Sequence, residues 1–350
     1  MRAFLANENV FYDPTTTASY SKWIPLFIAN HQLLAGGLMI NLALTGDFPT
    51  ALVPKLTEFS VLREQHDFSR SSIKRLLCEA EAYVLGGPEY LDAELLAGAR
   101  KLKLIVVLGT GTSSFLDEES ARLLGVAVQN TPHLNCDVVA DFARQIVEIE
   151  ASGVLQSIEG LKSRRSWNQE IRKATGSLKI GIIGGGPTAG ALMRELKKHG
   201  FQPVLYSSRS EKTEFGTKFD AVFCSAESVF QHADIVSIHY RFSETDEGML
   251  DHLLKLGRGQ VKVLNFSNPY LFTSGAVKAA LTQGWIKSFF LDGYYGRNVP
   301  DFTTWNDPEG LIDLPGFRAS SHIAALEESC IRTQLSSAFS KVTKFFEGTK

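Results

Sequence analysis

A glycine-rich turn between an apolar segment and an amphipathic segment constrains this chain more than any other feature. Residues 179–183 are apolar after the first, residues 184–190 read Gly-Gly-Gly-Pro-Thr-Ala-Gly, and helical spacing continues to Gly200. This order predicts a strand, a tight turn and a helix, the unit from which doubly wound parallel sheets are built. Glycine lets the backbone approach an anion, and the first N–H groups of a helix carry partial positive charge. The turn therefore predicts a pyrophosphate site.

The turn fits the dinucleotide-binding pattern G-x-G-x-x-A. Gly184 and Gly186 take the first two positions and Ala189 takes the third, where alanine is tolerated. Pro187 has no N–H, but its fixed φ suits a first helical turn. We predict a dinucleotide site formed by Gly184, Gly186, Pro187, Thr188 and Ala189. A glycine turn of a parallel sheet without any ligand is the alternative.

The end of the next predicted strand distinguishes NADP(H) from NAD(H). An NAD site carries an acidic residue there, which accepts a hydrogen bond from the ribose 2′-hydroxyl. This chain has Ser207 at that place, followed by Ser208, Arg209 and Lys212. Hydroxyls and a guanidinium hold a 2′-phosphate, which a carboxylate would repel. We predict NADP(H) as the cofactor with these four residues as contacts; a solvated Arg209 is the alternative.

Length and composition favour a globular protein of two domains. The chain has 350 residues, 44% of them hydrophobic and 21% charged, which suits two core-forming domains. Lys plus Arg (36) nearly equals Asp plus Glu (38), so net charge gives no support for a nucleic-acid partner. The apolar stretch at residues 23–44 is interrupted by polar residues and glycine, and the first residues lack a signal-peptide core; we expect no membrane partner. Four scattered cysteines without a Cys-x-x-Cys pair predict no metal site and a cytoplasmic location.

Strand and helix signals alternate along most of the chain, which predicts parallel βαβ units. An extension at residues 1–36 comes first. In the first half, strands are predicted at 38–44, 82–85, 104–108 and 126–128, and helices at 90–99 and 117–124. An amphipathic stretch at 138–161 and a polar segment at 162–175 follow the first domain crossing, near residues 135–138. In the second half, strands are predicted at 179–183, 203–206, 221–224, 235–239, 261–265 and 288–291, and helices at 190–199, 274–283 and 327–346.

Several short motifs appear in a fixed order between residues 80 and 348. They include Gly-Val-Ala-Val-Gln-Asn-Thr-Pro at 125–132, Val-Val-Ala-Asp-Phe-Ala at 138–143, Ala-Asp-Ile-Val-Ser-Ile-His at 233–239 and Ser-His-Ile at 321–323. With this set the chain resembles the D-isomer-specific 2-hydroxyacid dehydrogenases, and within them the glyoxylate/hydroxypyruvate reductase branch.

The resemblance implies an α/β fold of two Rossmann-like, doubly wound parallel-sheet domains. A cofactor domain at 137–321 would be inserted into a smaller, flavodoxin-like substrate domain formed by 37–136 and 322–350. The resemblance also implies a homodimer formed across the cofactor domains. The activity it implies is hydride transfer from NADPH to the carbonyl of a small-molecule substrate, either a 2-keto acid or an atypical carbonyl or imine.

The catalytic set of that family is only partly present. His322 matches the family's acid/base residue. The position of the family's substrate-binding Arg is Asn268, and the position of its Glu is Arg297. Asn268 can hydrogen-bond a carbonyl but has no charge for a carboxylate, and Arg297 would supply a cation if it faces the substrate. The alternative is a catalytically lapsed NADP(H)-binding sensor or partner-binding protein of the same fold.

The resemblance assigns the remaining site residues. Thr110 and Gly111 lie in a glycine-rich loop that binds the substrate carboxylate in the family, although the glycines are one residue out of register. His239 falls near the nicotinamide ribose, and Asp292 at the place that hydrogen-bonds the nicotinamide amide. Phe266 is expected as a further cofactor contact.

Overall fold

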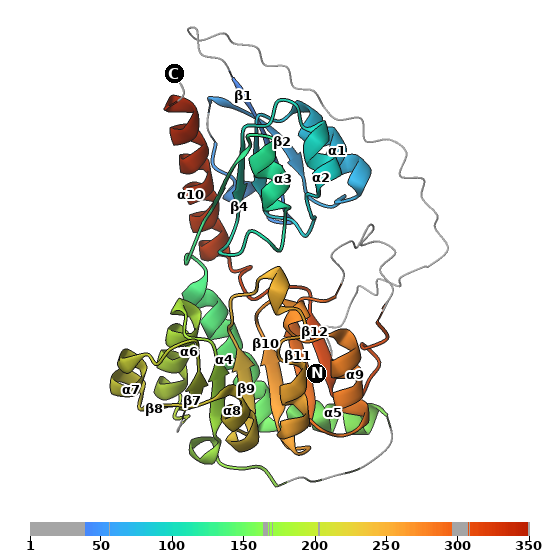
Figure 1. Ribbon diagram of the computed structural model, residues 1–350, viewed down its shortest axis with the longest axis vertical. Helices are drawn as coiled ribbons and strands as arrows, with labels where there is room; N and C mark the ends of the chain where they lie inside the picture. The colour runs from blue at the N-terminus through green and yellow to red at the C-terminus, as the bar shows by residue number, and fades with distance from the viewer. Residues whose placement is uncertain are drawn as a thin grey trace, which may run out of the picture. The chain divides into compact units, whose positions relative to one another are not determined.

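The computed structural model describes residues 39–55, 57–163, 167, 169, 171–201, 204–295, 307 and 309–348. The extension predicted at residues 1–36 and Arg297 lie outside these ranges. The described chain forms two parallel sheets, one of five strands and one of seven (Figure 1). None of its helices has the length and apolar composition needed to cross a membrane.

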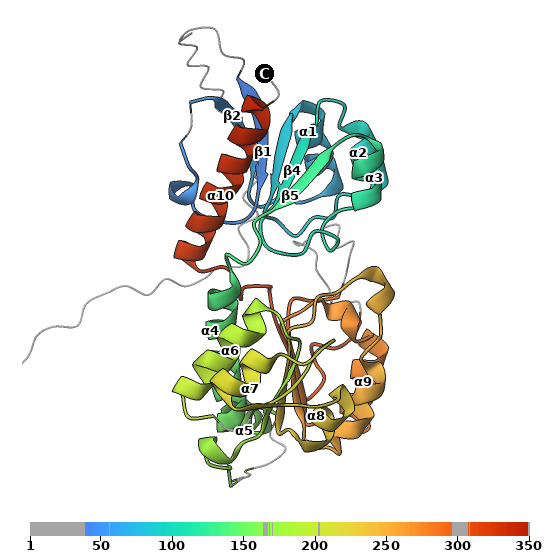
Figure 2. The ribbon, with the colours of Figure 1, turned by 60° about the vertical axis from the view of Figure 1, so that its left-hand side comes forward.

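The five-stranded sheet has the strand order β2-β1-β3-β4-β5, which is the flavodoxin-like order. Its strands are β1 (Ile40–Thr45), β2 (Phe59–Glu64), β3 (Ala82–Leu85), β4 (Leu104–Val107) and β5 (Ala127–Asn130). Side chains alternate between the two faces. Ala43, Tyr83 and Ile105 pack under one layer of helices, namely α1 (Arg70–Glu79), α2 (Ala93–Gly98) and α3 (Glu118–Leu123). Leu42 and Val84 point the other way and pack against the C-terminal helix α10 (Glu328–Glu347), coloured red in Figure 2.

The seven-stranded sheet has the order β12-β11-β10-β9-β6-β7-β8. Its strands are β6 (Ile180–Ile183), β7 (Val204–Ser207), β8 (Ala221–Phe223), β9 (Ile235–Ile238), β10 (Lys262–Asn265), β11 (Ser288–Asp292) and β12 (Phe317–Ser320). The strand order reverses between β6 and β9, which makes this pair the topological switch point. In open parallel sheets, ligands bind outside the carboxyl ends of the strands at such a point.

Helices cover both faces of this sheet (Figure 2). One layer contains α4 (Cys136–Ser152), α6 (Pro187–Lys198) and α7 (Thr213–Phe219). The other contains α8 (Ala226–His232), α9 (Ser274–Thr282) and the 3-10 helix η4 (Asp251–Gly257). The remaining helical segments are α5 (Val154–Lys162), η1 (Thr50–Leu52), η2 (Thr175–Ser177), η3 (Glu244–Asp246) and η5 (Pro269–Leu271).

The predicted strands are found with ends shifted by a few residues, and the structure corrects three details. The amphipathic stretch at 138–161 is two helices, α4 and α5, because Gly153 adopts a left-handed conformation with φ 68° that ends the first. Strands β2 and β12 were not predicted. Both lie at sheet edges, where only Phe59 and Phe317 are fully buried, so neither shows an apolar run.

A buried carboxylate holds together the amino ends of three strands in the larger sheet. Glu150 of α4 has no exposed surface. It lies 2.7 Å from Arg318 in β12 and 3.6 Å from Lys262 at the start of β10, and accepts a hydrogen bond from Ser288 at the start of β11. These groups lie at the amino ends of the strands, whereas a ligand at the switch point would bind at the carboxyl ends. Their role is therefore to fix the sheet, because a buried charge requires charged and hydrogen-bonding partners.

Candidate functional site

The glycine turn lies at the switch point of the larger sheet, and its first glycine is required by the backbone. Gly184 has φ 129°, a region that residues with side chains rarely adopt, and a Cβ there would lie 2.2 Å from the carbonyl oxygen of His239. Its N–H donates to the carbonyl oxygen of Ser207 at 2.8 Å. The turn therefore passes directly over the carboxyl ends of β7 and β9.

The start of α6 leaves open space for a ligand. Gly186 is the N-cap residue, no side chain caps the helix, and Pro187 is the first helical residue. A Cβ on Gly186 would meet no atom within 4 Å. Thr188 is half-buried, and Ala189 is fully buried against the sheet, which fits the close helix–strand packing of the third fingerprint position. Uncapped N–H groups next to open space suit a pyrophosphate.

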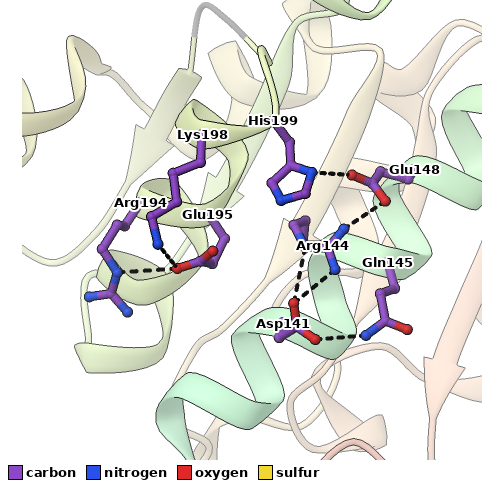
Figure 3. A network of polar contacts seen from close by, with 8 residues as sticks. All are labelled: Asp141, Arg144, Gln145, Glu148, Arg194, Glu195, Lys198 and His199. Carbon is purple, nitrogen blue, oxygen red and sulfur yellow. Dashed lines mark hydrogen bonds and ion pairs between the residues drawn. The ribbon is translucent and has the colours of Figure 1, made fainter.

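A polar network between α4 and α6 fixes the orientation of the helix that begins at this turn (Figure 3). Arg144 of α4 contacts Asp141 at 2.8 Å and Glu148 at 2.6 Å. Glu148 in turn lies 2.9 Å from Nδ1 of His199, the residue that ends α6. The network ties the far end of α6 to α4, so the uncapped end is held against the sheet.

The predicted adenosine side of the site consists of the residues that follow β7. Ser207 is the last residue of β7, and Ser208 donates its hydroxyl to the carbonyl oxygen of Ser210 at 2.6 Å. A Cβ built on Gly185 would lie 2.8 Å from Cβ of Ser208 and 3.3 Å from Cε of Lys212. The structure therefore brings Ser208 and Lys212 over the glycine turn, where an amine can approach a phosphate.

Arg209 is exposed and is oriented by a residue that the sequence did not predict. Its Nε and one terminal nitrogen each lie 3.3 Å from the hydroxyl oxygen of Tyr240, and its guanidinium carbon lies 5.6 Å from the centre of the Tyr240 ring. Tyr240 directly follows His239 after β9. Its position at a strand end of the switch point was the only sequence signal available.

His239 and Phe266 form an aromatic pair at the carboxyl ends of β9 and β10. The two rings are stacked, with centres 5.6 Å apart and planes at 8°. Nε2 of His239 lies 2.8 Å from the hydroxyl of Ser237. Burial lowers the pKa of His239 to about 3, so the ring is neutral at physiological pH. A neutral pair of this kind offers an apolar surface, which fits a cofactor contact and not a proton donor.

Asp292 holds the turn that carries His322. Its carboxylate, at the end of β11, accepts hydrogen bonds from the Ser320 hydroxyl at 2.7 Å, the Ile323 N–H at 2.9 Å and the Ala324 N–H at 3.1 Å. His322 lies between these donors, is exposed and has φ 59°, an uncommon value for a residue with a side chain. The carboxylate predicted to contact the nicotinamide amide thus also fixes the position of the predicted proton donor.

Asn268, the residue at the family's Arg position, is engaged at both ends of its amide. Its side-chain oxygen accepts from the N–H of Tyr270 at 2.9 Å and caps η5. Its side-chain nitrogen donates to the hydroxyl of Ser114 at 3.0 Å. One N–H of the amide remains for a substrate. Arg297, the third predicted catalytic residue, is outside the described residues.

The loop with Thr110 and Gly111 is fixed by the end of β5 and the segment that follows it. The Thr110 hydroxyl accepts from the His133 N–H at 3.2 Å, and its carbonyl oxygen accepts from the Asn130 side chain at 2.6 Å. A Cβ on Gly111 would meet no atom within 4 Å. The loop is therefore held at one residue and open at the next, which suits an anion approaching the backbone of Gly111.

Sequence reasoning missed a buried carboxyl at the switch point of the smaller sheet. Glu89 is 7% exposed and accepts hydrogen bonds from the hydroxyls of Thr45, at the end of β1, and Tyr83. The Thr45 hydroxyl oxygen accepts from the N–H groups of Gly86 and Gly87. Burial is the largest influence on Glu89 and raises its pKa. The network fixes the turn after β3; its partners are too far apart in the sequence to form a motif.

The described residues contain no group of three or more His, Cys, Asp or Glu side chains placed to hold a metal ion.

Comparison with known proteins gives consistent matches. Residues 140–324 match the family model described as D-isomer specific 2-hydroxyacid dehydrogenase, NAD binding domain. A glyoxylate reductase of Thermococcus litoralis is 28% identical over 252 residues, which are 69% of this chain and 75% of that protein. Glyoxylate/hydroxypyruvate reductase B of Erwinia tasmaniensis is 24% identical over 292 residues, 81% of this chain and 90% of that protein.

Solved structures share the fold. D-lactate dehydrogenase from Aquifex aeolicus, complexed with NAD and lactic acid, matches with a TM-score of 0.72 at 19% identity, covering 87% of this chain and 96% of that one. A protein from Thermus thermophilus matches with a TM-score of 0.71 at 21% identity, covering 88% and 97%. The predicted fold class, two doubly wound parallel-sheet domains, is confirmed.

Proposed function

Because the chain belongs to the D-isomer specific 2-hydroxyacid dehydrogenase family, we propose that it is an NADPH-dependent oxidoreductase acting on a 2-keto acid or a related small carbonyl or imine. The observation that carries this proposal is the glycine turn at the switch point. Gly184 brings the backbone against β9, and Gly186 leaves open space at an uncapped helix start. Together with Pro187, Thr188 and Ala189, these residues would hold the pyrophosphate.

The proposed chemistry divides between cofactor and protein. When bound, the dinucleotide supplies the hydride that the carbonyl carbon receives. His322 is the proposed donor of the proton that the carbonyl oxygen receives. Its turn is held by Asp292, which supports a fixed position for the imidazole. The remaining N–H of Asn268 would orient the carbonyl oxygen.

Two further groups of residues complete the proposed site. Thr110 and the backbone of Gly111 would bind a substrate carboxylate, and Arg297 is proposed to add a cation. His239 and Phe266 would pack against the nicotinamide ribose, since the pair is neutral and stacked.

The choice of NADP(H) rests on the residues after β7. Ser207 stands where an NAD site requires a carboxylate, and the exposed guanidinium of Arg209 is available for a 2′-phosphate. Ser208 and Lys212 lie over the glycine turn and would add a hydroxyl and an amine near the phosphates.

An assay of NADPH oxidation with glyoxylate, hydroxypyruvate and other 2-keto acids tests the proposal. We expect turnover with at least one substrate and a kcat about 100- to 10,000-fold lower in the His322→Ala variant, the usual contribution of a general acid. His66→Ala serves as the matched control, because the His66 side chain is 77% exposed and lies in the loop after β2. Turnover that does not change in His322→Ala would remove the assigned proton donor.

A second function is favoured by the state of Asn268. Its amide is already bonded to Tyr270 and Ser114, so the wall that binds a carboxylate in the family is occupied here by a structural contact. The second candidate is an NADP(H)-binding sensor without turnover. It predicts wild-type affinity for NADPH in His322→Ala and no oxidation with any substrate of the panel.

We also propose that the protein is a cytoplasmic homodimer, with domain boundaries at 37–136 plus 322–350 and at 137–321. Helix α5 supports the dimer, because it has no buried residue and exposes Val154, Ile158 and Leu161 on one face at 45%, 42% and 50%. Light scattering should give a dimer for the wild type and a monomer for Ile158→Lys, with Thr217→Lys on α7 as the control. A monomeric wild type would contradict this part.

A further inference from the structure

Tyr240 and Arg209 approach each other from opposite sides of the strand that carries the glycine turn. Arg209 follows β7 and Tyr240 follows β9, and both strands are direct neighbours of β6. The backbone N of Tyr240 lies 3.2 Å from the position of a Cβ on Gly184. The contact between the two side chains therefore spans the carboxyl end of β6, beside the place where a dinucleotide would bind.

The geometry of the contact leaves one edge of the guanidinium free. A guanidinium has five N–H donors in a rigid plane. The Nε–H and one N–H of a terminal nitrogen are directed at the hydroxyl oxygen of Tyr240, each at 3.3 Å. The three other N–H groups include the pair that points away from this edge. Such a pair binds two oxygens of a phosphate at once.

The tyrosine contributes more than a hydrogen-bond acceptor. Its ring lies under the guanidinium, with 5.6 Å between the guanidinium carbon and the ring centre, a favourable cation–π distance. The hydrogen bonds to Tyr240 raise the pKa of Arg209, with a smaller contribution from Asp246.

We propose that Tyr240 determines cofactor specificity by holding Arg209 in the orientation that binds a 2′-phosphate. This inference rests on the proposed use of NADP(H). An exposed arginine has many side-chain conformations, and a partner that fixes one of them reduces the entropy lost when the phosphate binds. The two residues would then act as one unit, with the tyrosine as the positioning residue and the arginine as the charged contact.

A double-mutant cycle on the full-length protein tests the inference, with NADPH and NADH as the two titrated ligands. We expect Tyr240→Phe, which keeps the ring and removes the hydroxyl, to weaken NADPH binding about fivefold, because water at this exposed site partly replaces the lost hydrogen bond. Arg209→Ala should weaken it at least about tenfold. The double variant should be no weaker than Arg209→Ala, because the tyrosine acts through the arginine.

NADH is the internal control, since it lacks the 2′-phosphate. Its Kd should change by less than about twofold in all three variants, which also shows that they are folded. If the wild type prefers NADPH and Tyr240→Phe keeps the whole preference, the inference is overturned and the proposed function stands. If the wild type binds both nucleotides equally, or neither, the result contradicts both the proposed use of NADP(H) and this inference.

Discussion

Replacing Asp292 with asparagine should loosen the turn that carries His322. In the wild type, one carboxylate oxygen accepts from Ser320 and Ile323 and the other accepts from Ala324. The amide of asparagine keeps the first two bonds only by pointing its NH2 group at the N–H of Ala324. One bond to a charged group is lost, two become neutral, and Ala324, which is 4% exposed, is left with an unpaired N–H.

The magnitude follows from these three contacts. A hydrogen bond to a charged group contributes about 1.5–3 kcal/mol and a neutral one about 0.5–1.5 kcal/mol. We therefore expect Asp292→Asn to lower the free energy of unfolding by about 2–4 kcal/mol, measured by urea denaturation. Because His322 has an uncommon φ that the turn maintains, kcat should fall about 10- to 100-fold. The KM for NADPH should change less than kcat does.

Ser320→Ala removes only one of the three donors and serves as the control. It should have a smaller effect on the free energy of unfolding and on kcat. An Asp292→Asn variant as stable and as active as the wild type would contradict this role of the carboxylate. A higher KM for NADPH with normal kcat would instead identify Asp292 mainly as a contact of the nicotinamide amide.

Four further predictions concern the two switch points and the buried charges. Gly186→Ala should abolish NADPH binding without a change in stability, because its Cβ meets no protein atom. Gly184→Ala should also lower the stability, since its Cβ would lie 2.2 Å from a carbonyl oxygen. Calorimetry measures the binding of NADPH to each variant, and thermal denaturation measures its stability. The pKa of His239 is about 3 in the folded protein, against 6.5 for an unperturbed histidine. As the pH falls, the unfolded chain therefore binds a proton at a higher pH than the folded protein does. Stability should therefore fall as the pH drops below about 6.5, by at most about 1.4 kcal/mol per pH unit, and His239→Asn should flatten this slope. Glu150→Ala should lower the free energy of unfolding by about 3 kcal/mol, because Lys262 and Arg318, each 12% exposed, lose a buried partner and Arg318 keeps only Glu159. A loss of less than about 1 kcal/mol in urea denaturation would contradict the role of this ion cluster. The Glu89→Gln variant should be as stable as the wild type below pH 4.5 and more stable at neutral pH, because the raised pKa of Glu89 makes ionisation of the buried carboxyl unfavourable. The same dependence of stability on pH in both proteins would contradict this.

The parts of the fold that could be predicted are those where one local pattern decides the outcome. Strands β3, β4 and β6 are buried at every position, so each appears in the sequence as an apolar run. The edge strands β2 and β12 lack that signal. Their hydrogen-bonding partners, not their own composition, make them strands, and no local pattern records a partner.

The same distinction applies to the site. The glycine turn could be predicted because the backbone requires glycine at Gly184, and because Gly186 leaves open space at the start of a helix. The pairing of Arg209 with Tyr240 joins residues 31 positions apart, and the contact of Asp292 with Ser320 joins residues 28 positions apart. Such contacts follow from strand order, which the sequence indicates only in outline. Asn268 follows β10, and its bond to Ser114 depends on a residue 154 positions away.

Titration calorimetry of the full-length protein with NADPH tests the central claim most directly, because it requires no knowledge of the substrate. The uncapped start of α6 next to Gly186 predicts saturable binding of one NADPH per chain, with weaker binding of NADH. An absence of binding heat for both nucleotides, over a range of temperatures, would contradict it.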